Sequence, residues 1–307
     1  MVSASKPMAA ALGVLADRVL AEPPSGLHPV RLFGLCMERF EARAYRDTRA
    51  AGVGHVAFGA GLGAAAGAVV GSTAAATYLA VAGRQLREVA ATIGDALEGD
   101  DLERARELLP SLVGREVATL DAQGMARAVV ESVAENTVDA VVAPAWWAAV
   151  AGAPGALGYR AVNTMDSMVG YRSDRYLRYG WASARLDDAA AFVPARVTAA
   201  LVVSVRPPAA AAVWHAVRTQ APLHPSPNAG VAEAAFAAGL GVRLGGENTY
   251  GDTTERRPTL GSGPSAAPPD IRRAVGLSQD VSDALCVLLG AVGLCLTTRR
   301  LARGRRR

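Results

Sequence analysis

The chain has 307 residues, of which 51% are apolar and 20% are charged, and its formal net charge is +4. This length suffices for a large core or for two domains, and so apolar a composition is unusual for a soluble protein. Six arginines in the last nine residues follow an apolar run. In that position a basic tail marks the cytoplasmic end of a membrane helix more often than a nucleic-acid site. We therefore expect a membrane protein with no nucleic-acid partner.

The first third of the chain contains an apolar run long enough to cross a bilayer. Residues 8–21 predict a short helix, and residues 31–49 predict an amphipathic helix at a surface or interface. Between Arg49 and Arg84 the chain carries no formal charge, over more than the roughly 20 residues that a membrane helix needs. Glycines recur there at every fourth position, namely Gly59, Gly63, Gly67 and Gly71. Small residues at this spacing let a second helix approach closely in lipid.

Three acidic residues stand four positions apart after a charged helical region over residues 84–128. Glu131, Glu135 and Asp139 would line one side of a helix, with Asn136 beside them. Like charges at this spacing repel each other by roughly a few tenths of a kcal/mol per pair when exposed. The pattern favours a cation between them, and a water-exposed helix end without a ligand is the alternative.

The next uncharged run, residues 140–159, is interrupted by Pro144, Gly152 and Pro154. It is long enough to cross a bilayer. A broken or re-entrant helix and a straight one are both compatible with it. Carboxylates at the mouth of such a run are costly without a partner, which again favours a ligand near residues 131–139.

The stretch 161–172 combines an amide, a carboxylate and a guanidinium with apolar residues at helical spacing. Asn163 and Asp166 would share one helix face, and Gly170 would end the helix. Asn and Asp oxygens are ligands that magnesium prefers, and Arg172 could hold a phosphate or carboxylate in a forked pair of hydrogen bonds. A capped amphipathic helix with solvated polar residues is the alternative.

An acidic pair then starts an apolar helix over residues 189–205 that Pro194 interrupts. Asp187 and Asp188 follow Arg185. Their negative charges could stabilise the helix start through the helix dipole, or they could bind a metal ion or an amine. The residues alone do not distinguish these two roles. Further on, residues 224–230 form a loop by their Pro and Gly content.

The last quarter begins with paired glycines after Arg243, whose backbone amides could approach an anion. Residues 252–270 are rich in Pro, Gly and Ser and predict a mobile connection. The apolar run 284–298 is short, but Arg299 and Arg300 extend it by snorkelling.

An ordered series of motifs resembles the adenosylcobinamide-phosphate synthase family of cobalamin biosynthesis, often called CobD/CbiB. The series comprises His28-Pro-Val, Glu131-Ser-Val-Ala-Glu-Asn-Thr, Ala161-Val-Asn-Thr-Met-Asp-Ser-Met-Val-Gly-Tyr-Arg, Ala184-Arg-Leu-Asp-Asp, Pro194-Ala-Arg, Ser226-Pro-Asn-Ala-Gly and Gly241-Val-Arg-Leu-Gly-Gly. It spans nearly the whole chain from about residue 10. Two departures are Ala21-Glu22-Pro23, where the family carries Gly-Asp-Pro, and Glu247-Asn-Thr-Tyr, where it tends toward Pro-Asn-Tyr-Tyr; the latter leaves the role of Glu247 open.

The resemblance implies an all-α, polytopic integral membrane bundle with amphipathic and broken or re-entrant helices, forming one domain over residues 1–307. It implies an inner-membrane enzyme that joins adenosylcobyric acid to (R)-1-amino-2-propanol or its O-phosphate, using ATP and Mg2+. Other cobalamin-assembly enzymes are possible partners. A corrinoid transporter and a non-catalytic scaffold of the corrin pathway are the alternatives, since carboxylates at a membrane edge suit a transporter equally well.

Site residues follow from the same motifs. The only lysine is Lys6 and no GxxxxGK is present, so arginines, backbone amides and magnesium must meet the phosphates. The candidate catalytic residues are Glu131, Glu135, Asp166, Asp187 and Asp188, with Asp187 or Asp188 as general base. The candidate substrate or ATP ligands are Asn136, Asn163, Arg172, Arg185, Asn228 and Arg243. The candidate metal ligands are Glu135, Asp139, Asn163 and Asp166.

The basic tail predicts a cytoplasmic C-terminus, and ATP requires the polar motifs to lie on that side as well. Strict alternation of the apolar runs would place residues 131–139 and 163–172 on opposite faces. We therefore expect residues 140–159 to dip into the membrane and return.

Overall fold

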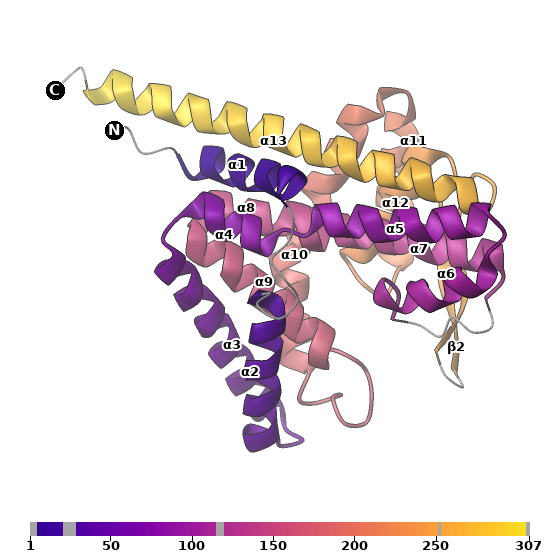
Figure 1. Ribbon diagram of the computed structural model, residues 1–307, viewed down its shortest axis with the longest axis horizontal. Helices are drawn as coiled ribbons and strands as arrows, with labels where there is room; N and C mark the ends of the chain where they lie inside the picture. The colour runs from indigo at the N-terminus through magenta and orange to yellow at the C-terminus, as the bar shows by residue number, and fades with distance from the viewer. Residues whose placement is uncertain (1–4, 21–28, 115–119, 251–252, 305–307) are drawn as a thin grey trace. The chain divides into compact units, whose positions relative to one another are not determined.

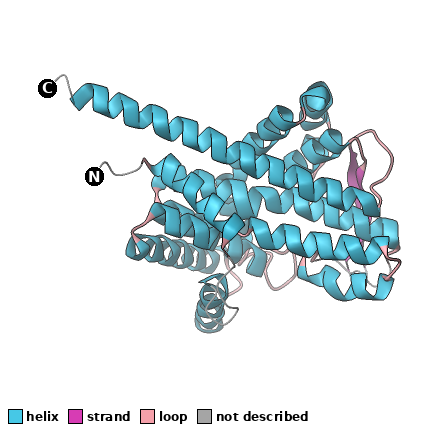
Figure 2. Ribbon diagram, turned by 45° about the horizontal axis from the view of Figure 1, so that its top comes forward, coloured by secondary structure: helices cyan, strands magenta, loops and turns pink. Residues whose placement is uncertain are grey.

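Helices make up most of the chain that a computed structural model describes, namely residues 5–20, 29–114, 120–250 and 253–304. Within these ranges the only sheet is a two-stranded antiparallel hairpin (Figure 2). The expectation of an all-α protein is thus confirmed, with the hairpin as an addition. The motif residues 21–23 and His28 lie outside the described residues.

Three helices are long and apolar enough to cross a membrane: α3 (Arg49–Val70), α10 (Trp181–Val205) and residues 268–299 of α13 (Pro268–Gly304) (Figure 1). Each contains or overlaps an apolar run expected from the sequence. Large apolar side chains on them are exposed, as lipid-facing residues are; examples are Val53, Phe58, Val69, Val287 and Leu294. Such exposure favours a lipid environment, because soluble monomers rarely expose large contiguous apolar patches.

The described chain divides into two units, and both are assembled from segments far apart in the sequence. Unit 1 comprises Met1–Ala82, Asp139–Ala191 and Leu285–Arg307, and unit 2 comprises Gly83–Val138 and Phe192–Ala284. Because the units interleave along the chain, the single-domain expectation stays a prediction.

Unit 1 contains α3 together with five shorter helices. These are α1 (Lys6–Val19), α2 (Pro29–Ala44), α4 (Thr73–Ala80), α8 (Ala143–Ala151) and α9 (Ala153–Val169). Helix α9 packs against α2, α3, α4 and α8, so it is the central helix of this unit. It carries the polar stretch around Asn163.

The glycine ridge of α3 packs against α9. A Cβ atom at Gly63 would lie 2.5 Å from Ala161 Cβ and 2.7 Å from the Leu157 carbonyl oxygen, and one at Gly59 would collide with Met165. Gly67 lies against the backbone of α9 at Ala153 in the same way. The predicted close helix approach is therefore confirmed, because only a residue without a side chain fits at these positions.

The interrupted run after Asp139 forms a π-helical segment, Val138–Val142, and two helices. Pro144 has no N–H to donate to the carbonyl of Ala140, four residues before it. That carbonyl accepts instead from the backbone N–H of Ala82 at 3.0 Å. Gly152, with φ +74° and ψ −153°, then separates α8 from α9. The broken form is confirmed; that it dips into a membrane and returns stays a prediction.

Helix α10 continues through Pro194, where the sequence predicts an interruption. Pro194 has no N–H to donate to the carbonyl of Ala190, four residues earlier. That carbonyl accepts instead from Trp147 Nε1 at 3.0 Å. An unsatisfied backbone group in lipid costs several kcal/mol, so the indole allows the helix to run on.

Unit 2 contains further helices and the hairpin, whereas α10 and α13 have residues in both units. Its helices are α5 (Gly83–Glu98), α6 (Leu102–Leu108), α7 (Ala122–Thr137), α11 (Ala210–Thr219) and α12 (Ala229–Leu240), with 3-10 turns at Leu109–Ser111, Pro207–Ala209 and Ala221–Leu223. The strands β1 (Leu244–Tyr250) and β2 (Thr253–Leu260) pair antiparallel. The predicted connection 252–270 thus contains a strand and the start of α13, and its mobility stays a prediction.

Candidate functional site

Polar side chains from three segments of unit 1 lie together around α9. Asn163 Nδ2 donates to Asp187 Oδ1 of α10 at 3.4 Å, and the hydroxyl of Tyr159 donates to Asp139 Oδ1 of the π-helical segment at 3.3 Å. Asp139 also interacts electrostatically with Asp187. Residues 139, 163 and 187 are far apart in the sequence and meet at one place in the fold.

Asp166 belongs to the same group, which we call the carboxylate cluster: Asp139, Asn163, Asp166 and Asp187. Its carboxylate, like that of Asp139, interacts electrostatically with Asp187. Asp187 lies within electrostatic range of two other carboxylates that repel it, and such repulsion grows as water is excluded. Arg160, which donates to Asn163, brings a positive charge to the same place, and a bound metal ion or ammonium group would add another.

The position of Asp166 depends on Gly170, which ends α9 as the sequence predicts. A Cβ at Gly170 would overlap the Asp166 carboxylate, and one at Gly180 would overlap the Val169 carbonyl oxygen. The φ of Gly170 is −71°, so glycine is needed there for space rather than for backbone conformation. Gly170 thus leaves room for the Asp166 side chain, and Gly180 lets the following loop approach the end of α9.

The loop after α9 is held by an aromatic and charged contact set from α2 and α3. Buried Glu41 accepts from Arg175 Nη2 and from the Tyr176 hydroxyl, both at 3.0 Å. The hydroxyl of buried Tyr179 bonds with His55 Nδ1 at 2.8 Å. Burial, with a further contribution from the Glu41 charge, raises the pKa of Tyr179 to about 12. The predicted anion ligand Arg172 lies exposed on this loop.

The two aspartates at the start of α10 differ in their surroundings. Asp187 joins the carboxylate cluster, whereas Asp188, whose charge acts only weakly on Asp187, interacts electrostatically with exposed Arg185. The structure thus separates a pair that the sequence left equivalent. Asp187 is the one placed to act with Asn163 and Asp166.

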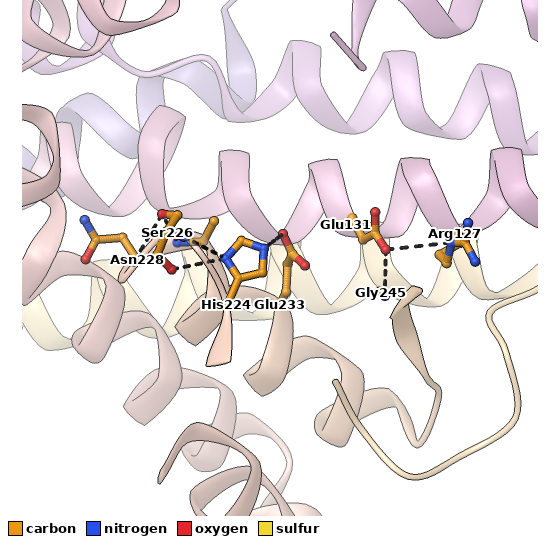
Figure 3. A network of polar contacts seen from close by, with 8 residues as sticks. Arg127, Glu131, His224, Ser226, Asn228, Glu233 and Gly245 are labelled. Atoms are coloured by element: carbon orange, nitrogen blue, oxygen red, sulfur yellow. Dashed lines mark hydrogen bonds and ion pairs between the residues drawn. The ribbon is translucent and has the colours of Figure 1, made fainter. Parts of the chain in front are cut away.

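The acidic residues of α7 have different environments from each other. Glu131 is buried in unit 2 and accepts from Gly245 N of β1 at 2.8 Å, with Arg127 Nε at 3.9 Å (Figure 3). Glu135 is exposed. Asn136 donates to Ser132 one turn earlier. The glycine amide expected to approach an anion therefore holds a carboxylate of the protein itself.

The remaining predicted ligands also lie in unit 2. Asn228 is buried, and its side-chain oxygen accepts from Arg196 Nη1 at 2.9 Å. Arg243 is exposed and donates to Ser265 Oγ at 2.8 Å. Glu135, Asn136, Asn228 and Arg243 therefore belong to the other unit from the carboxylate cluster, so a common site with it stays a prediction.

A magnesium ion fits the donor types of the carboxylate cluster. Across the described ranges, no three His, Cys, Asp or Glu side chains form a ready-made metal cage. Magnesium usually keeps several waters and binds through one or two carboxylates plus substrate phosphates, so such a cage is not required. The amide oxygen of Asn163 accepts from Arg160 Nη1 at 3.4 Å, a contact that competes with its predicted role as a metal ligand.

Several polar residues at these places were not predicted from the sequence. Tyr159 and Arg160 lie one turn before Asn163 and so share its helix face, a spacing that could have drawn attention to them. In unit 2, buried His224 has its Nε2 3.7 Å from Glu233 Oε1 of α12 (Figure 3). No local pattern links those two residues, because their contact depends on the fold of the loop before α12.

Comparison with known proteins places this arrangement in a family. The family model described as CobD/Cbib protein matches residues 10–278. A cobalamin biosynthesis protein CobD from Mycobacterium tuberculosis is 51% identical over 290 residues, covering 90% of this chain and 92% of the relative. Proteins of the same name from Chromobacterium violaceum and Geobacter metallireducens are each 40% identical, covering 92% and 81% of this chain and 97% and 84% of the relatives. No solved structure matches.

The family model covers the motifs at residues 131–139, 161–172, 184–188, 226–230 and 241–246. It therefore includes every member of the carboxylate cluster and most of both units. The chain belongs to the CobD/Cbib protein family.

Proposed function

We propose that the chain is a membrane enzyme of cobalamin biosynthesis, namely an ATP-dependent ligase that joins adenosylcobyric acid to (R)-1-amino-2-propanol or its O-phosphate. Membership of the CobD/Cbib family and the names of the relatives support the pathway. The observation that carries the reaction type is the carboxylate cluster, because a ligase of this kind must handle an ammonium group and the magnesium of ATP in one place.

Amide formation from a carboxylate needs activation of the acid. Transfer of the γ-phosphoryl group of ATP to the acid gives an acyl phosphate, which the amine attacks with release of phosphate. Catalysis of such transfer is mainly positioning and charge neutralisation. This chemistry suits a site with gathered carboxylates and nearby arginines rather than one with a covalent nucleophile.

The amine enters as an ammonium ion and must lose a proton before it can attack. In this proposal Asp187 takes that proton as a general base, and Asn163, which donates to Asp187 Oδ1, fixes the orientation of the carboxylate. The charges of Asp139 and Asp166 nearby hold the ammonium group in place before the transfer.

Magnesium, when bound with ATP, supplies neutralisation of phosphate charge. Asp166 and Asp139 are the carboxylates that would hold it, and Asn163 would contribute its oxygen after exchange of the Arg160 contact. Arg172 and Arg185, both exposed in unit 1, are proposed to receive phosphate or carboxylate oxygens.

The proposal places the enzyme in the inner membrane with a cytoplasmic C-terminus, because ATP is cytoplasmic and the arginines after α13 favour that side. Residues 135 and 172 must then face the same compartment. A map of cysteine accessibility in sealed vesicles tests this, since labelling of positions 135 and 172 from opposite sides would contradict it.

The reaction is tested with the full chain in detergent or vesicles, supplied with adenosylcobyric acid, aminopropanol or its phosphate, ATP and magnesium. Amide product and ATP consumption that both require acid and amine are the expected result. Movement of corrinoid across sealed vesicles with no new amide would instead establish a transporter. ATP consumption without dependence on either substrate would also refute the proposal.

A further inference from the structure

Arg196 of α10 has an unusual set of contacts within unit 2. Its Nη1 atom donates to the Phe192 carbonyl and to Asn228 Oδ1, both at 2.9 Å, and its guanidinium lies 3.6 Å from the centre of the Phe192 ring. Both hydrogen bonds use the same nitrogen, and within the described chain no bond is made at Nε or Nη2. The planar group is thus fixed, and its Nε–Nη2 edge remains available.

The charge of Arg196 has no acidic partner among the residues that the structure describes. Its bonded acceptors are a carbonyl and an amide oxygen, both neutral. Arg196 also lies within one of the three helices that could cross a membrane. An arginine in such a helix is costly and faces a cavity, a partner or a ligand, so the missing counter-charge calls for one.

A pocket of about 290 Å³ adjoins Arg196 within the same unit. It is lined by Arg196, Val217, Pro222, His224, Pro227 and Val231. Ligand pockets for drug-sized molecules span roughly 300 to 1,000 Å³. This one lies at the lower limit, which suits a small molecule and excludes a whole corrin.

The loop that contributes His224 and Pro227 to the pocket is held by hydrogen bonds of its own. His224 Nδ1 lies 3.1 Å from both the backbone N and the carbonyl oxygen of Ser226, and the Ser226 hydroxyl accepts from the backbone N–H groups of Asn228 and Ala229 (Figure 3). Asn228 in turn accepts from Arg196. The first amides of α12 are thus satisfied by Ser226, so the arginine, not the helix start, is the group that attracts an anion.

We propose that this pocket binds the phosphate group of a small phosphate monoester through the Nε–Nη2 edge of Arg196. Guanidinium groups bind phosphate oxygens in planar pairs of charge-assisted hydrogen bonds. The size of the pocket favours a small phosphate monoester over the nucleotide, and 1-amino-2-propanol O-phosphate is the probe that follows from the proposed function. The existence of an oxyanion site does not rest on it.

The test is binding of three probes to the full chain in detergent, measured by isothermal titration calorimetry: 1-amino-2-propanol O-phosphate, free 1-amino-2-propanol and ATP. We expect the phosphorylated amine to bind the wild type. We expect Arg196→Gln to weaken it by at least about tenfold, because the paired charge-assisted bonds are lost. Val217→Phe, which fills the pocket without altering its charge, should weaken binding as well and guards against a folding defect specific to the arginine variant.

Arg218→Gln is the matched control, because Arg218 is an exposed arginine of the neighbouring helix α11 that does not line the pocket. Its affinity should equal that of the wild type. Unchanged binding in both Arg196→Gln and Val217→Phe would overturn the proposal, and so would a loss confined to ATP. A wild type that binds the phosphorylated amine through Arg196 but forms no amide would refute the proposed ligase and leave the pocket standing.

Discussion

The carboxylate cluster of unit 1 and the Arg196 pocket of unit 2 carry side-chain charges of opposite sign. In the cluster, the carboxylates of Asp139 and Asp166 both repel that of Asp187. In the pocket, the bonds of the Arg196 guanidinium to other described residues go to neutral oxygens. The first place gathers carboxylates, and the second presents a guanidinium. The comparison teaches that the two units are suited to ligand groups of opposite sign, a cation in one and an oxyanion in the other.

The largest expected effect concerns the two aspartates at the start of α10. Asp187→Asn should lower the rate of ATP-dependent amide formation by about 10²- to 10⁴-fold, the usual contribution of a general base. Asp188→Asn is the matched control and should lower it less than about tenfold, because Asp188 interacts with Arg185 and its charge is the smallest of the influences on Asp187. Steady-state product assays measure both, and equal losses would break the distinction between the two residues.

The helix contact that positions the cluster can be tested by overpacking. Gly63→Ala should destabilise the protein by about 1–3 kcal/mol, because the new methyl group would lie 2.5 Å from Ala161 Cβ. Gly61→Ala has nothing within 4 Å of its added carbon and should cost no stability. Unfolding of the two variants in mixed detergent gives the comparison. A Gly63→Ala variant as stable as Gly61→Ala would show that α3 and α9 are not in close contact.

Glu131 offers a way to sharpen the comparison between buried and exposed charges. Glu131→Gln keeps an oxygen for Gly245 N but loses the charge, which should cost about 1 kcal/mol, the difference between charged and neutral hydrogen bonds. Exposed Glu135→Gln is the control and should leave stability unchanged. Limited proteolysis of the hairpin reports the effect. Complete loss of activity with unaltered proteolysis would return Glu131 to the catalytic role predicted from the sequence.

The smallest effect is expected at Tyr179, at the loop that follows the cluster helix. Its folded pKa of about 12 exceeds the ordinary value near 10. The folded state therefore holds this proton more tightly than the unfolded state, so the stability from this group is fully present below pH ~10 and falls as the pH rises toward ~12. Thermal unfolding between pH 9 and 12 should show that fall in the wild type and a shallower one in Tyr179→Phe. Identical slopes would contradict the buried, hydrogen-bonded hydroxyl.

Much of the fold was predictable because it depends on local patterns. Short stretches of sequence are enough to recognise the uncharged run of α3, its glycine spacing and the helix end at Gly170. The structure confirms all three. The hairpin was not predicted. The Gly, Pro and Ser content around residues 241–270 indicated a loop more strongly than the threonines at 253 and 254 indicated a strand. The course of α10 through Pro194 depends on Trp147, a partner distant in sequence.

The candidate site was predictable in part for the same reason. Asn163 and Asp166 share a face through helical spacing, but their meeting with Asp187 depends on how α9 and α10 pack. The expected row of Glu131, Glu135 and Asp139 assumed a regular helix. Burial of Glu131 against β1 and the π-helical segment at Asp139 are tertiary features that spacing alone cannot reveal.

One measurement tests most directly whether the carboxylate cluster is a single reaction centre: a double-mutant cycle of Asp166→Asn and Asp187→Asn on ATP-dependent amide formation. Residues that act as a unit are strongly non-additive. The double variant should therefore be no more than about threefold slower than the slower single variant. Losses that multiply, as expected for independent positions, would contradict a shared centre.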